Sequence, residues 1–193
     1  SLTLDNVVIS GGVTDSTVGG LVCQANLSLN RVANLTINSS TIEGNESGLS
    51  GGGISLERCS AVTINNTQFF DNISHSNGGG FHNEGSVTTN ITNSLFYNNM
   101  VVGGGGGGGL ANIETGYVHL KNTTFTGNTA TAGGAILNHS NSAASQTNMD
   151  IDSSTISGNI ATGNGIGSTA GIYNITTATT HIKNSIVAGN VNT

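Results

Sequence analysis

The repeat that decides the fold is visible in residues 64–99, which read INNTQFFDNISHSNGGGFHNEGSVTTNITNSLFYNN. An apolar residue at Ile64 is followed five residues later by Phe69, and the same pair returns 27 residues further on as Ile91 and Phe96. Between the two pairs, a run of glycines leads into a third apolar residue, Phe81. This regular return of apolar residues indicates a solenoid in which one repeat makes one circuit.

The same three apolar positions recur along the whole chain, at offsets of 33, 27, 27, 29, 31 and 31 residues. The first position holds Leu4, Ile37, Ile64, Ile91, Leu120, Ile151 and Ile182. The second holds Ile9, Ile42, Phe69, Phe96, Phe125, Ile156 and Val187. The third holds Leu21, Ile54, Phe81, Leu110, Ile136 and Ile172.

Around each first position, apolar and polar residues alternate, as in Leu35-Thr36-Ile37-Asn38, which is the period of a β-strand. No segment keeps the three- and four-residue spacing that an amphipathic helix requires. We therefore predict an all-β protein, a parallel β-helix of about six to seven rungs with three short strands in each. A single domain is expected to span residues 1–193, because the repeat runs through all of them.

Asparagine and small polar residues follow each apolar position at a fixed distance, where the chain must turn. Asparagine tolerates the left-handed backbone of a tight corner, and stacked amides can bond to one another from rung to rung. We therefore interpret most asparagines as structural. The three corner sets include Asn66, Asn93 and Asn122, then Asn72, Asn99 and Asn128, and finally Asn83, Asn112 and Asn138.

Composition excludes several classes of protein. Only 7% of the 193 residues are charged and the net charge is −6 with four basic residues, so a nucleic-acid partner is not expected. No apolar run has the length of a membrane span, so membrane insertion is not expected either. The glycine run at residues 103–109 lacks the lysine and Ser/Thr of a phosphate loop, and we interpret it as a flexible excursion. No cofactor is predicted.

Two elements alternate along the chain, F-x-x-N as in Phe96-Tyr97-Asn98-Asn99 and G-G-A-[ILV] as in Gly133-Gly134-Ala135-Ile136. This alternation resembles the repeats of the polymorphic outer-membrane-protein family and of kindred bacterial and archaeal surface β-helix proteins. The resemblance covers nearly the whole chain. It implies a right-handed parallel β-helix that is exported, secreted or displayed at the cell surface, and adhesive.

One charged patch is predicted on the outside of the first strand in the last three rungs. Rungs lie about 4.8 Å apart, so these side chains should form one compact surface. It is either a weak candidate for a metal or carbohydrate-contact site, or a cross-strand ladder of alternating charge. The patch consists of His119, Asp150 and His181 before the apolar position and Lys121, Asp152 and Lys183 after it.

An enzyme is the alternative class, since parallel β-helices include polysaccharide lyases and hydrolases. Such catalysis needs carboxylates that converge on one face, or a basic residue beside an acid. The acidic residues Glu43, Asp71, Glu84 and Glu114 fall on different columns or rungs, and neither Arg31 nor Arg58 has an obvious acidic cluster opposite. No catalytic residue is therefore predicted, and we do not expect an enzyme.

The two cysteines allow two interpretations. Cys23 lies at the third corner of the first rung and Cys59 in the turn just beyond the equivalent corner of the second. A disulfide between them is geometrically feasible because the insertion after Cys23 provides slack. Alternatively, Cys23 is a small buried hydrophobic residue in place of a ladder asparagine.

Ten N-x-[ST] sequons occur, and five of them are candidates for N-glycosylation. Those at Asn45, Asn72, Asn122, Asn138 and Asn174 lie on corner ladders and are expected to be inaccessible. The candidates on outward columns or beside an insertion are Asn26, Asn34, Asn38, Asn65 and Asn90.

Both ends of the repeat array are expected to be uncapped, which would expose apolar core and strand edges. Head-to-tail stacking of copies is then the favoured function, giving an extracellular structural or adhesive fibre whose main partner is the chain itself. The alternatives are a passenger segment of a larger adhesin, binding surface glycans or proteins, and the enzyme above. The expected assembly residues are Leu2, Leu4, Ile9, Ile182 and Val187.

Overall fold

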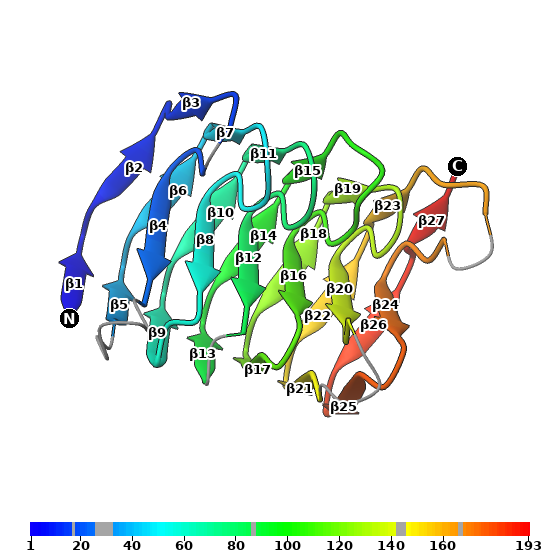
Figure 1. Ribbon diagram of the computed structural model, residues 1–193. Helices are drawn as coiled ribbons and strands as arrows, with labels where there is room; N and C mark the ends of the chain where they lie inside the picture. The colour runs from blue at the N-terminus through cyan, green and yellow to red at the C-terminus, as the bar shows by residue number, and fades with distance from the viewer. Residues whose placement is uncertain (17, 26–32, 86–87, 142–145, 166–167) are drawn as a thin grey trace.

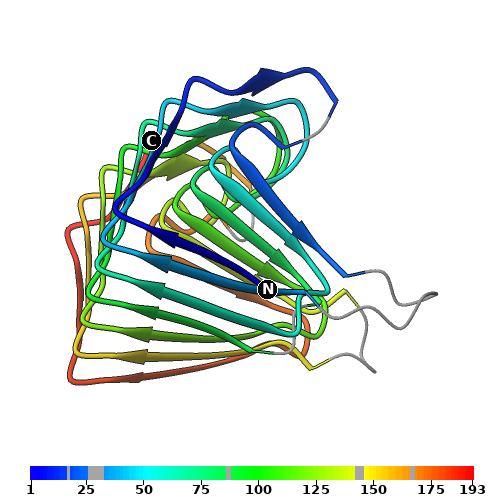
Figure 2. The ribbon, with the colours of Figure 1, turned by 90° about the vertical axis from the view of Figure 1, so that its left-hand side faces the viewer.

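The computed structural model is described here for residues 1–16, 18–25, 33–85, 88–141, 146–165 and 168–193. These residues form an all-β solenoid in which every strand pairs in parallel with its equivalents in the neighbouring rungs (Figure 1). Three sheets have seven strands and the fourth has six. Seen from the N-terminal end, the chain turns clockwise as it recedes, so the helix is right-handed (Figure 2). The predicted fold class is confirmed.

Four sheets, named A to D in chain order, form the walls of the solenoid. Sheet A contains β1 (Leu2–Asp5), β5 (Asn34–Asn38), β9 (Ala61–Asn65), β13 (Thr89–Thr92), β17 (Tyr117–Lys121), β21 (Asn148–Asp152) and β25 (Thr179–Lys183). Sheet B contains β2 (Val8–Ser10), β6 (Thr41–Glu43), β10 (Gln68–Phe70), β14 (Leu95–Tyr97), β18 (Thr124–Thr126), β22 (Thr155–Ser157) and β26 (Ile186–Ala188). Sheet C contains β3 (Val13–Thr14), β7 (Glu46–Ser47), β11 (Ile73–Ser74), β15 (Met100–Val101), β19 (Thr129–Ala130), β23 (Ile160–Ala161) and β27 (Val191–Asn192). Sheet D contains β4 (Leu21–Gln24), β8 (Ile54–Glu57), β12 (Phe81–Glu84), β16 (Leu110–Ile113), β20 (Ile136–His139) and β24 (Ile172–Ile175).

Sheet C corrects the prediction of three strands in each rung, because most rungs contain four. Its strands are only two residues long. Their inward positions hold small residues such as Ser47, Ser74 and Ala130, which are buried but form no column of large apolar side chains. The hydrophobic periodicity therefore carried no signal for these strands.

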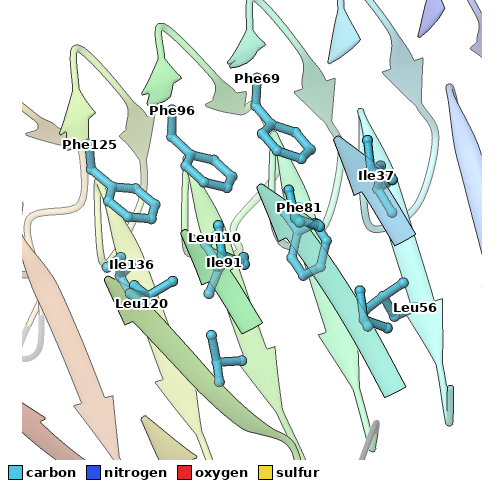
Figure 3. Packing of buried hydrophobic residues seen from close by; sticks show 14 of the residues in the cluster. Ile37, Leu56, Phe69, Phe81, Ile91, Phe96, Leu110, Leu120, Phe125 and Ile136 are labelled. Carbon is cyan, nitrogen blue, oxygen red and sulfur yellow. The ribbon is translucent and has the colours of Figure 1, made fainter. Parts of the chain in front are cut away.

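The three apolar columns point inward and make the core, as predicted. Phe69, Phe96 and Phe125 stack face to face along the axis, with ring centroids 4.5 Å apart in each pair (Figure 3). Phe81, on sheet D, meets the ring of Phe69 edge on at 6.0 Å. All four rings are fully buried.

Buried asparagines bond from rung to rung inside two corners. Asn72, Asn99, Asn128 and Asn159 each donate their amide to the side-chain oxygen of the next copy, at 2.8–3.0 Å. Each also donates to a carbonyl of the preceding rung, as Asn99 does to Phe69 at 2.9 Å. Because both donor bonds are made within the protein, burying these polar groups carries no unpaired-donor penalty.

The left-handed backbone lies only partly where it was predicted. Asn66, Asn93 and Asn122 at the first corner have φ of 51°, 53° and 50°, as expected. At the second corner, however, the left-handed residue precedes the ladder asparagine, for example Asp71 and Asn98 with φ of 54° each. Hydrogen bonding, and not backbone tolerance, therefore accounts for asparagine at positions such as Asn72.

The glycine run at residues 103–109 is a packed turn, which corrects the prediction of a flexible excursion. Gly106 to Gly109 are buried. A Cβ at Gly105 would lie 1.7 Å from the carbonyl oxygen of Ser76 in the preceding rung, and one at Gly108 would lie 2.3 Å from that of Gly134 in the next. Glycine is needed here because the turns of successive rungs touch backbone to backbone.

Candidate functional site

The predicted charged patch forms a shallow groove on the outer face of sheet A, with a volume of about 340 Å³. The alternation of β17, β21 and β25 turns Leu120 and Ile151 inward and places their polar neighbours on both sides of the groove. Register pairing sets Asp150 between His119 and His181, and Asp152 between Lys121 and Lys183. The structure therefore brings all six predicted residues together.

Asp150 is the centre of one side of this groove. Its Oδ2 accepts a hydrogen bond from the Tyr117 hydroxyl at 2.7 Å and lies 3.2 Å from Nδ1 of His119. The rings of Tyr117 and His119 lie against each other, with centroids 4.2 Å apart. The hydrogen bond to Asp150 raises the pKa of Tyr117, because the carboxylate favours the protonated phenol. Tyr117 was not predicted as part of the patch. Its position directly before the inward Val118 did indicate that its side chain points outward, on the same side as His119.

Asp152 is the centre of the other side of the groove. Its Oδ1 accepts hydrogen bonds from Asn184 Nδ2 and Ser153 Oγ at 3.0 Å, and its Oδ2 lies 3.5 Å from the Lys183 Nζ. The hydrogen bond from Asn184, with those from its other partners, lowers the pKa of the Asp152 carboxyl. Both aspartates are therefore engaged by neighbouring side chains.

The contacts favour the charge ladder over a metal site. Across the described ranges of the chain, no three His, Cys, Asp or Glu side chains come close enough to hold a metal ion. The contacts made by the two aspartates are cross-strand ion pairs and hydrogen bonds of the kind that stabilise a sheet surface. The patch can offer polar contacts to a carbohydrate, but it holds no arrangement that resembles a metal centre.

The cysteines form a disulfide, with Cα atoms 6.2 Å apart. Cys59 is fully buried and Cys23 nearly so, and both pack in the main core. The bridge ties the first rung to the second across a separation of 36 residues. Of the two interpretations, the structure has the disulfide, and Cys23 is a buried core residue as part of that bridge and not in place of it.

Two of the sequon asparagines that were expected to be inaccessible are exposed in the structure. Asn45, Asn72 and Asn138 are buried, but Asn122 and Asn174 are exposed, because the first-corner amides point outward and Asn174 lies in the last rung. Of the five candidates, Asn34 and Asn90 are exposed, and Asn38 and Asn65 are half-buried. Asn26 lies outside the described residues.

The end rungs expose apolar side chains at the predicted assembly positions. Leu2 is 45% exposed, Ile182 47% and Val187 45%, whereas Leu4 and Ile9 are partly buried against the core. Neighbouring positions in the same rungs, Val8 and Ile186, are 63% and 60% exposed. Val8 and Ile186 lie at an outward position of sheet B, whereas Leu2, Ile182 and Val187 belong to inward columns that are buried in the middle rungs.

A second concavity, of about 560 Å³, lies over the outer face of sheet D in the first three rungs, and the sequence did not indicate it. We call it the sheet D groove. Its floor comes from β4, β8 and β12, and its wall from the turns that lead from sheet C to sheet D. It is lined by Val18, Gly20, Val22, Gln24, Leu49, Ser50, Ser55, Glu57, Ser76, His82 and Glu84.

Acidic residues converge beside this groove, which corrects the expectation that Arg58 has no acidic cluster near it. Glu57 and Glu84 are adjacent in register on β8 and β12. Arg58 and Glu114 flank Gly85 from the rungs on either side. Burial, then the charges of Glu114 and Glu57, raise the pKa of Glu84, while Arg58 lowers it. Positions on different rungs can thus converge, because the strands stack in register.

His82 forms part of the groove floor and is only 3% exposed. Its Nδ1 lies 3.3 Å from the Ser55 hydroxyl. Burial lowers the pKa of His82 from 6.5 to about 4, so the ring is neutral at neutral pH. A neutral histidine beside two carboxylates does not compensate their charge.

The lowered pKa of His82 predicts a loss of stability in acid. The stabilisation is complete above pH 6.5 and is lost as the pH falls towards 4, because the unfolded chain binds the proton first. The free energy of unfolding should fall by up to about 3 kcal/mol over that range, since one pKa unit is worth about 1.4 kcal/mol. His82→Asn should remove this part of the pH dependence in urea titrations.

The exposed His181 provides the matched control for this measurement. The loss of stability between pH 6.5 and 4 should be smaller in His82→Asn than in His181→Asn. Glu84 has a raised pKa and so contributes in the opposite direction, but it is present in both variants and cancels in the comparison. Equal pH profiles for His82→Asn and the wild type would contradict the prediction.

The parallel sheets and the buried rows of asparagines define the class of the protein, a parallel β-solenoid with asparagine ladders. Within it, a family model described as the Chlamydia polymorphic membrane protein repeat matches residues 122–139. This segment includes Phe125-Thr126-Gly127-Asn128 and Gly133-Gly134-Ala135-Ile136, one copy of each of the two alternating elements. No curated protein and no solved structure matches the chain. Among the described residues there is no apolar helix of the length that a bilayer requires.

Proposed function

We propose that this chain is a non-enzymatic, adhesive or structural β-helix displayed outside the cell, and that copies of it stack end to end. The match of residues 122–139 to a polymorphic membrane protein repeat supports the surface location. The disulfide between Cys23 and Cys59 supports an oxidising compartment.

The observation that carries the stacking proposal is the match between the two end rungs. β1 of the first rung and β25 of the last belong to one sheet, as do β2 and β26, so they share the same layout. Both rungs leave apolar side chains exposed, among them Leu2 and Ile182. A parallel rung from a second copy would cover these side chains and extend each sheet by one more strand.

Stacking of this type predicts a clear effect of one buried charge. Leu4→Lys places an ammonium at the core position of β1, where the next copy would lie, and should convert assemblies into folded monomers. Sedimentation velocity and negative-stain microscopy of the wild type should show filaments that persist in high salt, because the contact is apolar.

Thr3→Lys is the matched control. This substitution adds the same charge as Leu4→Lys, but on the exposed, outward side of the same strand. It should leave assembly unchanged, and circular dichroism should show that both variants keep the β fold. The proposal is wrong if the wild type sediments as a monomer at high concentration, or if Leu4→Lys leaves filament length unchanged. Depolymerisation of an acidic polysaccharide by the wild type would instead support the enzyme alternative.

A further inference from the structure

The sheet D groove has the form of a binding site. Its volume of about 560 Å³ falls in the range of ligand pockets. Apolar side chains gather at its N-terminal part, where Val22 and Leu49 are 52% and 55% exposed. Polar groups gather next to them on the floor, namely Ser55, His82, Glu57 and Glu84. An occupant should therefore combine an apolar part with a polar or charged end.

The charge of the groove selects a cation. Glu57, Glu84 and Glu114 are acidic, and Arg58 is the basic residue among the charges that act on Glu84. Among the described residues, no ion pair within 4.0 Å joins Arg58 to any of these carboxylates. Two of the carboxylates, Glu57 and Glu84, face the groove, and His82 beside them adds no charge at neutral pH.

The groove is better suited to an organic cation than to a metal ion. In the described part of the chain, no group of three His, Cys, Asp or Glu side chains is placed to coordinate a metal. A guanidinium group matches two neighbouring carboxylates because its N–H donors form a planar fork. The aliphatic stem of an arginine can lie along apolar surface while its charged end reaches polar groups.

We propose that the sheet D groove binds an arginine side chain of an extended peptide segment in a partner protein. The stem lies against Val18, Val22 and Leu49, and the guanidinium donates to Glu57 and Glu84. This deepens the proposed adhesive function, on which it rests, by naming the class of partner. It does not depend on end-to-end stacking, because the groove residues lie on sheet D and its preceding turns, whereas the expected assembly residues lie on sheets A and B.

Fluorescence anisotropy with a labelled peptide tests the proposal. The probe is a short acetylated, amidated peptide with one arginine between two valines. The comparison peptide carries citrulline in place of arginine, which keeps the shape and removes the charge. The arginine peptide should bind saturably at a 1:1 ratio, and the citrulline peptide at least about tenfold more weakly.

Matched protein variants locate the site. Glu57→Gln with Glu84→Gln should weaken binding of the arginine peptide at least about tenfold, because both acceptor carboxylates are lost. Glu43→Gln with Asp71→Asn removes the same number of charges near sheet B and should leave binding unchanged. An equal loss in both double variants would mean non-specific attraction to the net charge of −6 and would overturn the proposal.

The same titration in the Leu4→Lys background separates this proposal from stacking. Unchanged peptide binding by that variant supports the groove whether or not the wild type forms filaments. Absence of saturable binding in every background, or equal binding of the arginine and citrulline peptides, would overturn the groove proposal and leave stacking unaffected.

Discussion

Replacing Phe96 by alanine should lower the free energy of unfolding by about 3–5 kcal/mol. The ring is fully buried and stacks on both neighbours, Phe69 and Phe125, with centroids 4.5 Å away in each case. Truncation would leave a cavity between two rungs, which cannot collapse because the backbone spacing is set by the parallel strands above and below. Urea unfolding followed by circular dichroism measures the effect.

The adjacent Tyr97 is the control for this substitution. Its side chain is on the same strand, β14, but points outward and is 44% exposed. Tyr97→Ala should change the free energy of unfolding by less than about 1 kcal/mol. If both substitutions had the same small effect, the interior position of the phenylalanine column would be wrong.

Replacing Asn99 by alanine should cost about 4 kcal/mol, because it removes the centre of a buried ladder. The Asn99 amide donates to the carbonyl of Phe69 at 2.9 Å and to Asn128 Oδ1 at 3.0 Å. Its Oδ1 accepts from the backbone and side chain of Asn72, at 3.2 and 2.9 Å. Alanine would leave these partners buried without a hydrogen bond. Each such group that no water molecule can reach should lower the free energy of unfolding by about 1–3 kcal/mol.

Asn90 provides the comparison, since it is an asparagine exposed on the outer face of sheet A. Asn90→Ala should be close to neutral. Hydrogen exchange adds a local measurement, because loss of the ladder should accelerate exchange of the Asn72 amide, which donates to Asn99. A small effect of Asn99→Ala with unchanged exchange would show that the ladder contributes little to stability.

Several interpretations from the sequence hold because they depend only on which residues repeat. The alternation around Ile37 and the constant five-residue step to Ile42 define two strands and the corner between them, whatever the rest of the fold. Stacking in register then brings equal positions together, so the phenylalanine column and the patch of His119, Asp150 and His181 follow directly. The prediction that Asn122 is inaccessible was wrong, because the direction of a corner side chain depends on the backbone conformation, and Asn122 has a left-handed φ of 50°.

The sequence by itself determined the solenoid, the inward columns and the asparagine ladders, because each is a property of one position repeated along a stack. Only the tertiary structure decided what lies outside the columns. The two-residue strands of sheet C lack an apolar period, the glycine run is packed because Gly105 meets Ser76 of another rung, and the groove near Glu84 forms where turns fold back over sheet D. These contacts join residues at different positions in the repeat, and their distances depend on the path of the turns in space.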